Sequence, residues 1–354
     1  MEIKIELSNN LKSKPSENEL QFGKYFTDHM FVMDYTDEKG WHNPCIMPYS
    51  PLMLEPAAMV LHYGQAVFEG MKCYRKSDGK LLLFRPEKNF ERLNASDERL
   101  CIPHIDESFA LKALMELLKI EKDWVPSAKN TSLYIRPFTI ATDFGLGVHA
   151  SNSYKFLIIL SPVGLYYAEG LNPVKICIEG EYVRAVRGGI GFTKATANYA
   201  SSLKGQMEAK KKGYAQVLWL DGVERKYIEE VGTMNIFFVI DGEVITPSLE
   251  GSILPGVTRN SVLELTKSWG MKVTERRISI QELYEAFENG RLEEAFGTGT
   301  AAVISPISEF NWCGESIVLS GGNIGPIAQK LYDQLTGIQY GKLEDEFGWV
   351  REVV

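Results

Sequence analysis

The amino-acid sequence predicts an α+β protein with two domains. Strand-like and helical runs follow one another without strict alternation, whereas a doubly wound parallel sheet needs a helix after each strand. The dipeptide Asp-Gly, a strong signal for a tight hairpin, accompanies strand-like runs at 78–79, 221–222 and 241–242. The length of 354 residues exceeds the size at which a single hydrophobic core usually stops growing.

A stretch without clear periodicity separates two sets of elements. It runs from Gly164 to Pro173 and is bounded by glycine and proline, the residues that most often end regular structure. We therefore expect a smaller N-terminal domain over 1–164, an interdomain loop over 165–178 and a larger C-terminal domain over 179–354.

Each domain is expected to contain strands, hairpins and a few helices. Strands begin near Phe22, and apolar residues at helical spacing indicate a helix over 106–122. The other expected strands cover 73–84 (as a hairpin), 132–138, 155–161, 174–179, 215–220, 235–240 and 243–246, and the other expected helices cover 85–93, 198–212, 257–269, 280–289 and 324–335.

Composition argues against several classes of function. The formal net charge is −8 and the pI is near 5.4, which disfavours nucleic acid or an anionic membrane surface as the main partner. No apolar run reaches the length of a membrane span, and the charged N-terminus lacks the apolar core of a signal peptide. Five scattered cysteines without a Cys-x-x-Cys pair, and five dispersed histidines, favour a cytoplasmic protein without a metal centre.

One lysine lies in a glycine-rich turn just ahead of a helix. Glycines occupy positions 188, 189 and 191, and Lys194 precedes the helix expected from 198. Glycine at this density is used where a chain turns sharply or approaches a ligand closely. A lysine near helix amides can lose its proton more easily and act as a nucleophile. The segment alone is better explained by a solvated surface lysine, so the neighbouring motifs decide the interpretation.

Three further segments combine acids, hydroxyls and glycine. Residues 229–235 place two acids and a threonine at the end of a strand, where an acid can pair with a heteroaromatic nitrogen. In 253–259 a glycine, a threonine and a helix start form a cup of amides suited to phosphate. In 296–303 small residues and hydroxyls form a turn whose amides can converge on an anion. Each segment alone is better explained by a turn or by a helix capped by Thr258.

An arginine and one strand face supply further polar groups. Arg92 lies on the expected helix, where an outward guanidinium forms a surface ion pair and an inward one suits a phosphate. Tyr134 and Arg136 share one face of the strand over 132–138 and could bind a carboxylate, although an edge strand explains the same letters. Taken together, the lysine, the acid, the two anion cups, the arginine and the Tyr/Arg face would hold a phosphorylated pyridine aldehyde and an amino-acid carboxylate.

In their order along the chain, these segments resemble the branched-chain amino acid aminotransferases, in the fold-type IV group of pyridoxal-phosphate enzymes. The resemblance covers about 22–341 and includes the blocks 61–72, 133–137, 194–200, 229–235, 254–259 and 297–301. So many ordered blocks at compatible spacing are specific, whereas each one alone is not. The resemblance implies a smaller N-terminal α/β domain, a larger C-terminal mixed α/β domain, pyridoxal 5'-phosphate as cofactor, and a homodimer.

The resemblance also implies a role for each matching residue. Lys194 matches the lysine that binds the cofactor as a Schiff base and moves the Cα proton, and Glu230 matches the acid paired with the pyridine nitrogen. The other residues expected to contact the cofactor are Arg92, Tyr199, Thr233, Leu254, Val257, Thr258 and Thr300. The residues expected to contact the substrate are Tyr63 (from the other subunit), Phe68, Tyr134, Arg136, Tyr166, Thr233, Ala301 and Ala302.

The implied reaction is reversible transfer of the amino group of L-leucine, L-isoleucine or L-valine to 2-oxoglutarate, giving 2-oxo acids and L-glutamate, in branched-chain amino acid biosynthesis. The alternative within the same fold is a D-amino acid aminotransferase or an aminodeoxychorismate lyase, relatives that lack much of the N-terminal pattern found here. A non-catalytic protein that has kept the fold would have lost Lys194 or Glu230, and both are present.

Overall fold

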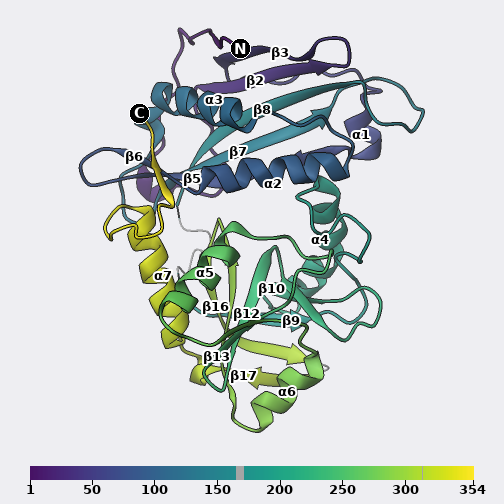
Figure 1. Cartoon of the computed structure of the whole chain (residues 1–354), viewed down its shortest axis with the longest axis vertical. Coiled ribbons are helices and arrows are strands. Elements are labelled where there is room, and N and C mark those ends of the chain that lie inside the picture. Colours follow the sequence, from purple (N-terminus) through teal and green to yellow (C-terminus); the bar gives the residue numbers. More distant parts are fainter. Residues whose placement is uncertain (165–170, 313) are drawn as a thin grey trace. The chain divides into compact units, whose positions relative to one another are not determined.

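The computed structural model describes residues 1–164, 171–312 and 314–354, which fall into two compact units (Figure 1). The first unit comprises Met1–Tyr166, Thr193–Ala197 and Gly337–Val354, and the second comprises Tyr167–Phe192 and Asn198–Thr336. Both units contain helices and strands, which confirms the predicted α+β class. Among the described residues, no helix is long and apolar enough to cross a membrane.

The first unit is built on one sheet. Within the described residues its nine strands follow the order β1-β3-β2-β8-β7-β5-β6-β18, with β4 paired to β7, so the two ends of the chain supply the two sheet edges. The strands are β1 (Lys4–Ile5), β2 (His29–Thr36), β3 (Gly40–Pro48), β4 (Ala66–Phe68), β5 (Met71–Arg75), β6 (Leu81–Phe84), β7 (Ser132–Ala141), β8 (Ser153–Val163) and β18 (Val350–Glu352). The helices are α1 (Met59–Tyr63), α2 (Pro86–Arg99) and α3 (Glu107–Ile120), with short 3-10 turns at Glu17–Glu19 and Lys122–Trp124.

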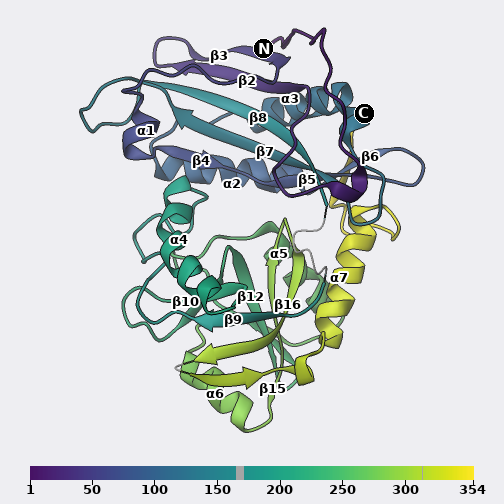
Figure 2. The ribbon, with the colours of Figure 1, turned by 180° about the vertical axis from the view of Figure 1, so that it is seen from behind.

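Helices α2 and α3 lie side by side on one face of this sheet. In Figure 1 they lie in front of the strands, and from behind, in Figure 2, the strands lie in front of them. The main core of the unit includes Phe90 of α2, Leu114 of α3 and Phe156 of β8, all buried. Helix α3 begins where the Asp106 carboxylate accepts the amide of Phe109 (2.8 Å), a regular N-cap.

Helix α2 is longer than its apolar pattern indicates because tertiary contacts cover its polar half. The periodicity ends at Leu93, but the helix continues to Arg99. Asn94 is buried and exchanges two hydrogen bonds with the backbone of Ile105, one through Nδ2 and one through Oδ1 (both 2.9 Å). These bonds satisfy polar groups that local sequence would assign to solvent.

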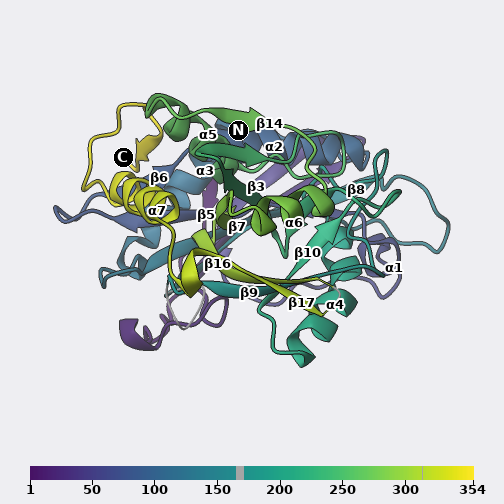
Figure 3. The same cartoon turned by 90° about the horizontal axis from the view of Figure 1, so that it is seen from below.

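The second unit closes six strands into a small barrel. Its order is β11-β10-β9-β16-β15-β12-β13-β14, with β17 on β16, and a further β11–β12 pairing closes the ring. Figure 3 shows β9, β16 and β17 side by side.

The strands of the second unit are β9 (Val174–Ile178), β10 (Gln216–Leu220), β11 (Ile228–Val231), β12 (Met234–Ile240), β13 (Glu243–Thr246), β14 (Val273–Glu275), β15 (Leu292–Gly299), β16 (Val303–Trp312) and β17 (Glu315–Val318). The helices are α5 (Val257–Ser268) and α6 (Ile280–Glu288), with a 3-10 turn at Ser320–Gly322. Helices α4 (Thr196–Lys211) and α7 (Pro326–Gln339) each contain one of the positions at which the chain changes unit.

Two of the three Asp-Gly pairs form the predicted tight hairpins. Asp241 and Gly242 join β12 to β13, and both have positive φ angles (52° and 71°), as a type I′ turn requires. Asp78 and Gly79 lie in the turn 76–80, which joins β5 to β6. Asp221 begins a longer loop instead, because its carboxylate accepts four amides from residues 223–227.

The domain boundaries expected from the sequence stay a prediction, and the compact units differ from them at two places. Residues 193–197 and 337–354 belong to the first unit, because Ala195 bridges to Val67 of β4 and because β18 pairs with β6. Part of the predicted interdomain loop, residues 165–170 with Tyr166, lies outside the described residues, as does residue 313.

Asp97 is an unusual member of helix α2. Its side chain is fully buried, and neither carboxyl oxygen has a hydrogen-bond partner among the described residues. Burial raises the pKa of Asp97 well above its ordinary value. A group whose pKa is raised on folding favours the folded state most below its unfolded pKa, about 3.9, and loses that contribution as the pH rises through the folded pKa. Asp97 therefore destabilises the fold most at neutral and alkaline pH.

Replacing Asp97 by alanine should stabilise the protein at pH 8. We expect the free energy of unfolding to rise by about 1 kcal/mol, because a buried polar group without a partner is removed. The gain should shrink as the pH falls towards 4. Urea unfolding at several pH values measures it, with Glu98→Ala on the exposed side of the same helix as the control. A D97A protein that is less stable than the wild type at pH 8 would contradict the assignment of Asp97 as a destabilising group.

Candidate active site

The backbone of Lys194 is attached to the first unit by hydrogen bonds at both of its polar groups. Its carbonyl accepts the amide of Phe68 (3.1 Å), and its amide donates to the hydroxyl of Ser96 on α2 (2.9 Å). The next residue, Ala195, bridges to Val67 in antiparallel fashion. The lysine side chain is half-buried and leaves a backbone that two elements of one unit hold in place.

An aromatic and cationic cluster surrounds the Lys194 amine. Nζ of Lys194 lies 4.9 Å from the centre of the Phe68 ring, and the Arg136 guanidinium carbon lies 4.5 Å from the same centre. Arg136 Nη2 donates to the hydroxyl of Tyr134 (3.1 Å), so the predicted Tyr/Arg face is present on β7. Gly70 is required beside it, because a Cβ there would lie 2.2 Å from the Tyr134 hydroxyl. Four residues expected from the sequence are thus neighbours: Phe68, Tyr134, Arg136 and Lys194.

Arg92 points inward, as one of the two sequence interpretations required. Its Nε and Nη2 donate to the two oxygens of Glu69 (2.7 and 2.9 Å), and both side chains are buried. No role for Glu69 was expected from the sequence. An acid inside the apolar run 66–71 could have indicated one, since a buried acid needs a partner.

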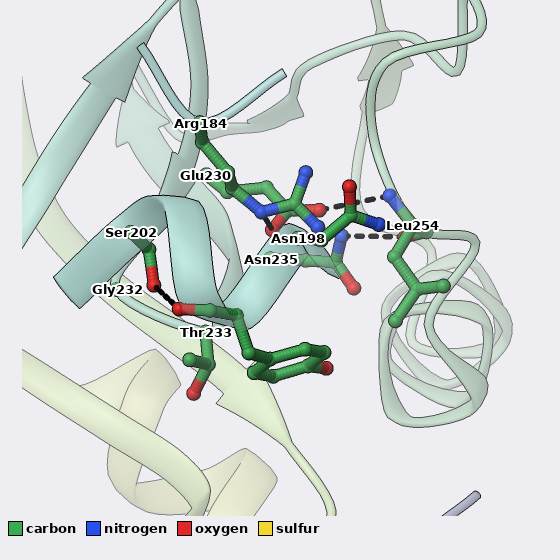
Figure 4. A pocket seen from close by; sticks show the side chains of 9 residues that line it. Arg184, Asn198, Ser202, Glu230, Gly232, Thr233, Asn235 and Leu254 are labelled. Carbon is green, nitrogen blue, oxygen red and sulfur yellow. Dashed lines mark hydrogen bonds and ion pairs between the residues drawn. The ribbon is translucent and has the colours of Figure 1, made fainter. Parts of the chain in front are cut away.

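A pocket in the second unit gathers four of the predicted cofactor residues (Figure 4). It is a hollow of roughly 320 Å³, including space open to solvent. It is lined by Arg184, Asn198, Tyr199, Ser202, Glu230, Gly232, Thr233, Asn235 and Leu254. Val257, Thr258, Thr300, Ala301 and Ala302 are not part of this lining among the described residues.

Glu230 is the buried acid of this pocket, and Figure 4 shows it between Arg184 and Leu254. One carboxylate oxygen accepts the amide of Leu254 (2.8 Å), and the other pairs with Nε of Arg184 (2.9 Å). Nη1 of Arg184 donates to the carbonyl of Ser252 (3.0 Å), so this buried guanidinium is anchored as well. Arg184 lies in no recognisable motif of the sequence, so its place in the site could not be predicted.

Glu229, the other acid of the segment, points away from the pocket. Successive strand residues face opposite sides, and its carboxylate accepts the hydroxyl of Ser252. Burial raises the pKa of Glu229, with the Ser252 hydrogen bond acting in the opposite direction. The two adjacent acids therefore have separate surroundings.

The turn that leads into helix α5 is built around Asn235. Its Nδ2 donates to the carbonyl of Leu254 (2.9 Å), and a Cβ on Gly256 would lie 2.0 Å from its Oδ1. Gly256, not Thr258, is the N-cap of α5, and it makes no side-chain capping bond. The first amides of the helix, at Val257 and beyond, therefore keep the character of an anion cup.

The remaining predicted residues lie at two other places. Thr300, Ala301 and Ala302 form the half-buried turn between β15 and β16. Tyr63 ends α1 in the first unit, is 39% exposed and donates its hydroxyl to the carbonyl of Leu146.

Comparison with known proteins connects these features to one family. The family model described as amino-transferase class IV matches residues 66–310. Branched-chain-amino-acid aminotransferase 2 of Bacillus subtilis is 62% identical over 351 residues, which cover 99% of this chain and 97% of that protein. The crystal structure of the Escherichia coli branched-chain amino acid aminotransferase superposes with a TM-score of 0.78 at 28% identity, covering 92% of this chain and 99% of that one. A T.th. branched-chain amino acid aminotransferase, solved with pyridoxamine 5'-phosphate, gives a TM-score of 0.75 at 26% identity, covering 91% and 98%.

The chain therefore belongs to the class IV aminotransferase family and, within it, to the branched-chain amino acid aminotransferases. The resemblance inferred from the ordered sequence blocks is confirmed, and it extends over almost the whole chain.

Arg184 and Glu230 should stabilise the fold as a pair. Arg184→Leu is expected to lower the free energy of unfolding by about 3 kcal/mol, because it leaves a buried carboxylate without its cation. Adding Glu230→Gln should recover part of this loss. Urea unfolding of both single variants and the double variant gives the coupling energy. Arg187→Leu, which breaks an exposed pair with Glu250, serves as the control and should cost less than about 1 kcal/mol. Strictly additive losses would show that the two buried groups act independently.

Proposed function

We propose that this chain is a pyridoxal-phosphate-dependent transaminase that transfers the amino group of L-leucine, L-isoleucine or L-valine to 2-oxoglutarate. A relative at 62% identity carries the name of this activity, and a solved structure of the family holds pyridoxamine 5'-phosphate. The observation that supports it most is Glu230, a buried carboxylate in a pocket that Tyr199, Thr233 and Leu254 also line. Its use in biosynthesis stays a prediction.

The donors and acceptors of the chain fit this cofactor. A carboxylate can accept up to about four hydrogen bonds, so Glu230 can accept one more, from a ring nitrogen, beside those from Arg184 and Leu254. The amides that open α5 and the buried Thr258 hydroxyl suit the phosphate, as does the guanidinium of Arg92. The apolar side chain of Leu254 suits the ring face.

When bound, pyridoxal phosphate supplies an aldehyde carbon that accepts the amino group and a ring that spreads the negative charge of the substrate Cα. Lys194 would contribute the amine that binds the cofactor covalently between turnovers and that takes the proton from Cα and returns it. Glu230 would hold a proton at the ring nitrogen, and Tyr199 would donate towards the phenolic oxygen.

The substrate groups follow from the same assignment. Tyr134, Arg136 and the amides of Ala301 and Ala302 would bind the carboxylate, which is common to amino acids and 2-oxo acids. Phe68, with its ring against Arg136, would form an apolar wall for the branched side chain.

We also propose that the protein is a homodimer through the first unit. The loop over 143–149 packs on α1, since the amide of Met59 donates to the carbonyl of Asp143 (2.8 Å). The large apolar side chains left exposed here are Leu61 at 60%, Phe144 and Leu146 at 71% each, and Val148 at 81%. Apolar side chains that cluster in this way are typical of a protein interface.

An absorption spectrum of the purified protein tests the reaction. We expect a visible band that L-leucine converts to a near-ultraviolet band and that 2-oxoglutarate restores. Glu230→Gln should keep the cofactor but lower turnover by about 100-fold or more. The matched control is Glu229→Gln, one residue away on the other side of the strand, which should turn over normally.

A band that responds only to a D-amino acid would support a D-amino acid aminotransferase instead. Absence of any band after pyridoxal phosphate is added would exclude the proposed cofactor. Near-normal turnover of E230Q would remove the role of the acid.

Sedimentation velocity tests the dimer. Phe144→Ser combined with Leu146→Ser should shift the protein towards the monomer, because both residues then stop contributing apolar area to the interface. The control is Val223→Ser, which changes a side chain of similar exposure (79%) in the second unit. A wild-type protein that sediments as a monomer would contradict the proposal.

A further inference from the structure

Glu69 is a fully buried acid directly after β4, the strand that carries Phe68. It lies within an apolar run, and hydrophobic contacts alone would not select a carboxylate there. The proposed reaction assigns it no role.

The carboxylate of Glu69 accepts hydrogen bonds from three residues. Oε1 accepts Nε of Arg92 (2.7 Å), and Oε2 accepts Nη2 of Arg92 (2.9 Å). Oε2 also accepts Nδ2 of Asn89 (2.7 Å) and the amide of Gly70 (3.1 Å). A two-point contact of this kind fixes the plane of the guanidinium as well as its position. The direction in which Arg92 presents its remaining donors is therefore set by Glu69.

The same turn of α2 also holds the lysine. The Ser96 hydroxyl donates to the carbonyl of Arg92 (3.0 Å) and accepts the amide of Lys194 (2.9 Å). The residue before Glu69, Phe68, donates its amide to the carbonyl of Lys194. One hydrogen-bonded network of the first unit thus includes Glu69, Arg92 and Lys194.

The charge on Glu69 is maintained by these neighbours. Burial by itself raises the pKa of Glu69, but the charge and hydrogen bonds of Arg92 outweigh it, and Lys194 and Asn89 add to their effect. The pKa is therefore held below its ordinary value, and the group is an anion beside two cations.

We propose that Glu69 is a positioning residue that orients Arg92 towards the cofactor phosphate. The inference rests on the proposed function, because it gives Arg92 the role assigned there. A purely structural role is the simpler alternative. However, a buried ion pair contributes little net stability compared with apolar residues of the same shape, so stability alone does not explain an acid at this position.

The test compares how the protein binds pyridoxal phosphate and pyridoxal, which lacks the phosphate. Glu69→Gln keeps the shape of the side chain and removes its charge. It should weaken binding of pyridoxal phosphate by about 10- to 100-fold, because the charge-assisted bonds that align Arg92 are lost. Binding of pyridoxal should change much less. The matched control is Glu87→Gln on the same helix, where an exposed Glu87 pairs with Arg351 at the surface.

The comparison of the two ligands distinguishes positioning from a merely structural role. A general loss of stability would weaken binding of pyridoxal phosphate and of pyridoxal alike, whereas a misaligned Arg92 affects only the ligand that carries a phosphate.

The outcomes separate this inference from the proposed function. If the wild type binds the cofactor and responds to L-leucine while E69Q matches E87Q in its selection between the two ligands, only the role of Glu69 is overturned. If the wild type itself fails to respond, the proposed function fails. Should E69Q not fold, Glu69→Asp decides: its charge remains but its reach is shorter. Weaker selection of pyridoxal phosphate supports the proposal, and wild-type selection overturns it.

Discussion

The hydrogen bond from the Phe68 amide to the Lys194 carbonyl, with the Val67–Ala195 bridge beside it, is the contact on which the site in the first unit depends. It attaches a five-residue segment from the middle of the chain, Thr193–Ala197, to a sheet formed mainly by the first 163 residues. Backbone pairing of this kind is insensitive to side-chain identity but strict in register. It therefore determines which side chains surround the lysine amine, namely Phe68 and, through the same ring, Arg136.

Each unit also contains one buried acid held by one buried arginine. In the first unit Glu69 binds Arg92 at two points, and in the second Glu230 binds Arg184 and the amide of Leu254. Charges of this kind are expensive to bury unless they are paired and hydrogen-bonded. In both units the acid is paired with a cation away from bulk water. Such surroundings make a charged group useful for orienting or protonating a ligand, because the interaction is weakly screened.

Local sequence patterns predicted the structure correctly where that structure depends on residues close together in the chain. The Asp-Gly turn at 241–242 and the helix that starts near Asp106 depend on a few neighbouring residues, and both occur as expected. The pattern failed where distant residues cover polar groups. Helix α2 continues beyond its predicted end because the backbone of Ile105 forms hydrogen bonds with the Asn94 side chain. Asp221 begins a wide loop because its carboxylate accepts hydrogen bonds from four backbone amides.

The sequence by itself determined the α+β class, the family and the residues that match its motifs, because ordered blocks such as 194–200 and 229–235 carry chemistry that few other families need. Only the tertiary structure decided which partners those residues have. Arg184 lies in none of the matching blocks, and Glu69 lies in one without an expected role, yet they bind Glu230 and Arg92 directly. Glu229 and Glu230 are adjacent in sequence, but successive residues of a strand point to opposite faces. Of the two acids, only Glu230 lines the pocket with Arg184 and Leu254. The reason is that a motif specifies a residue type at a position, whereas charge pairing depends on strands and helices that meet from distant parts of the chain.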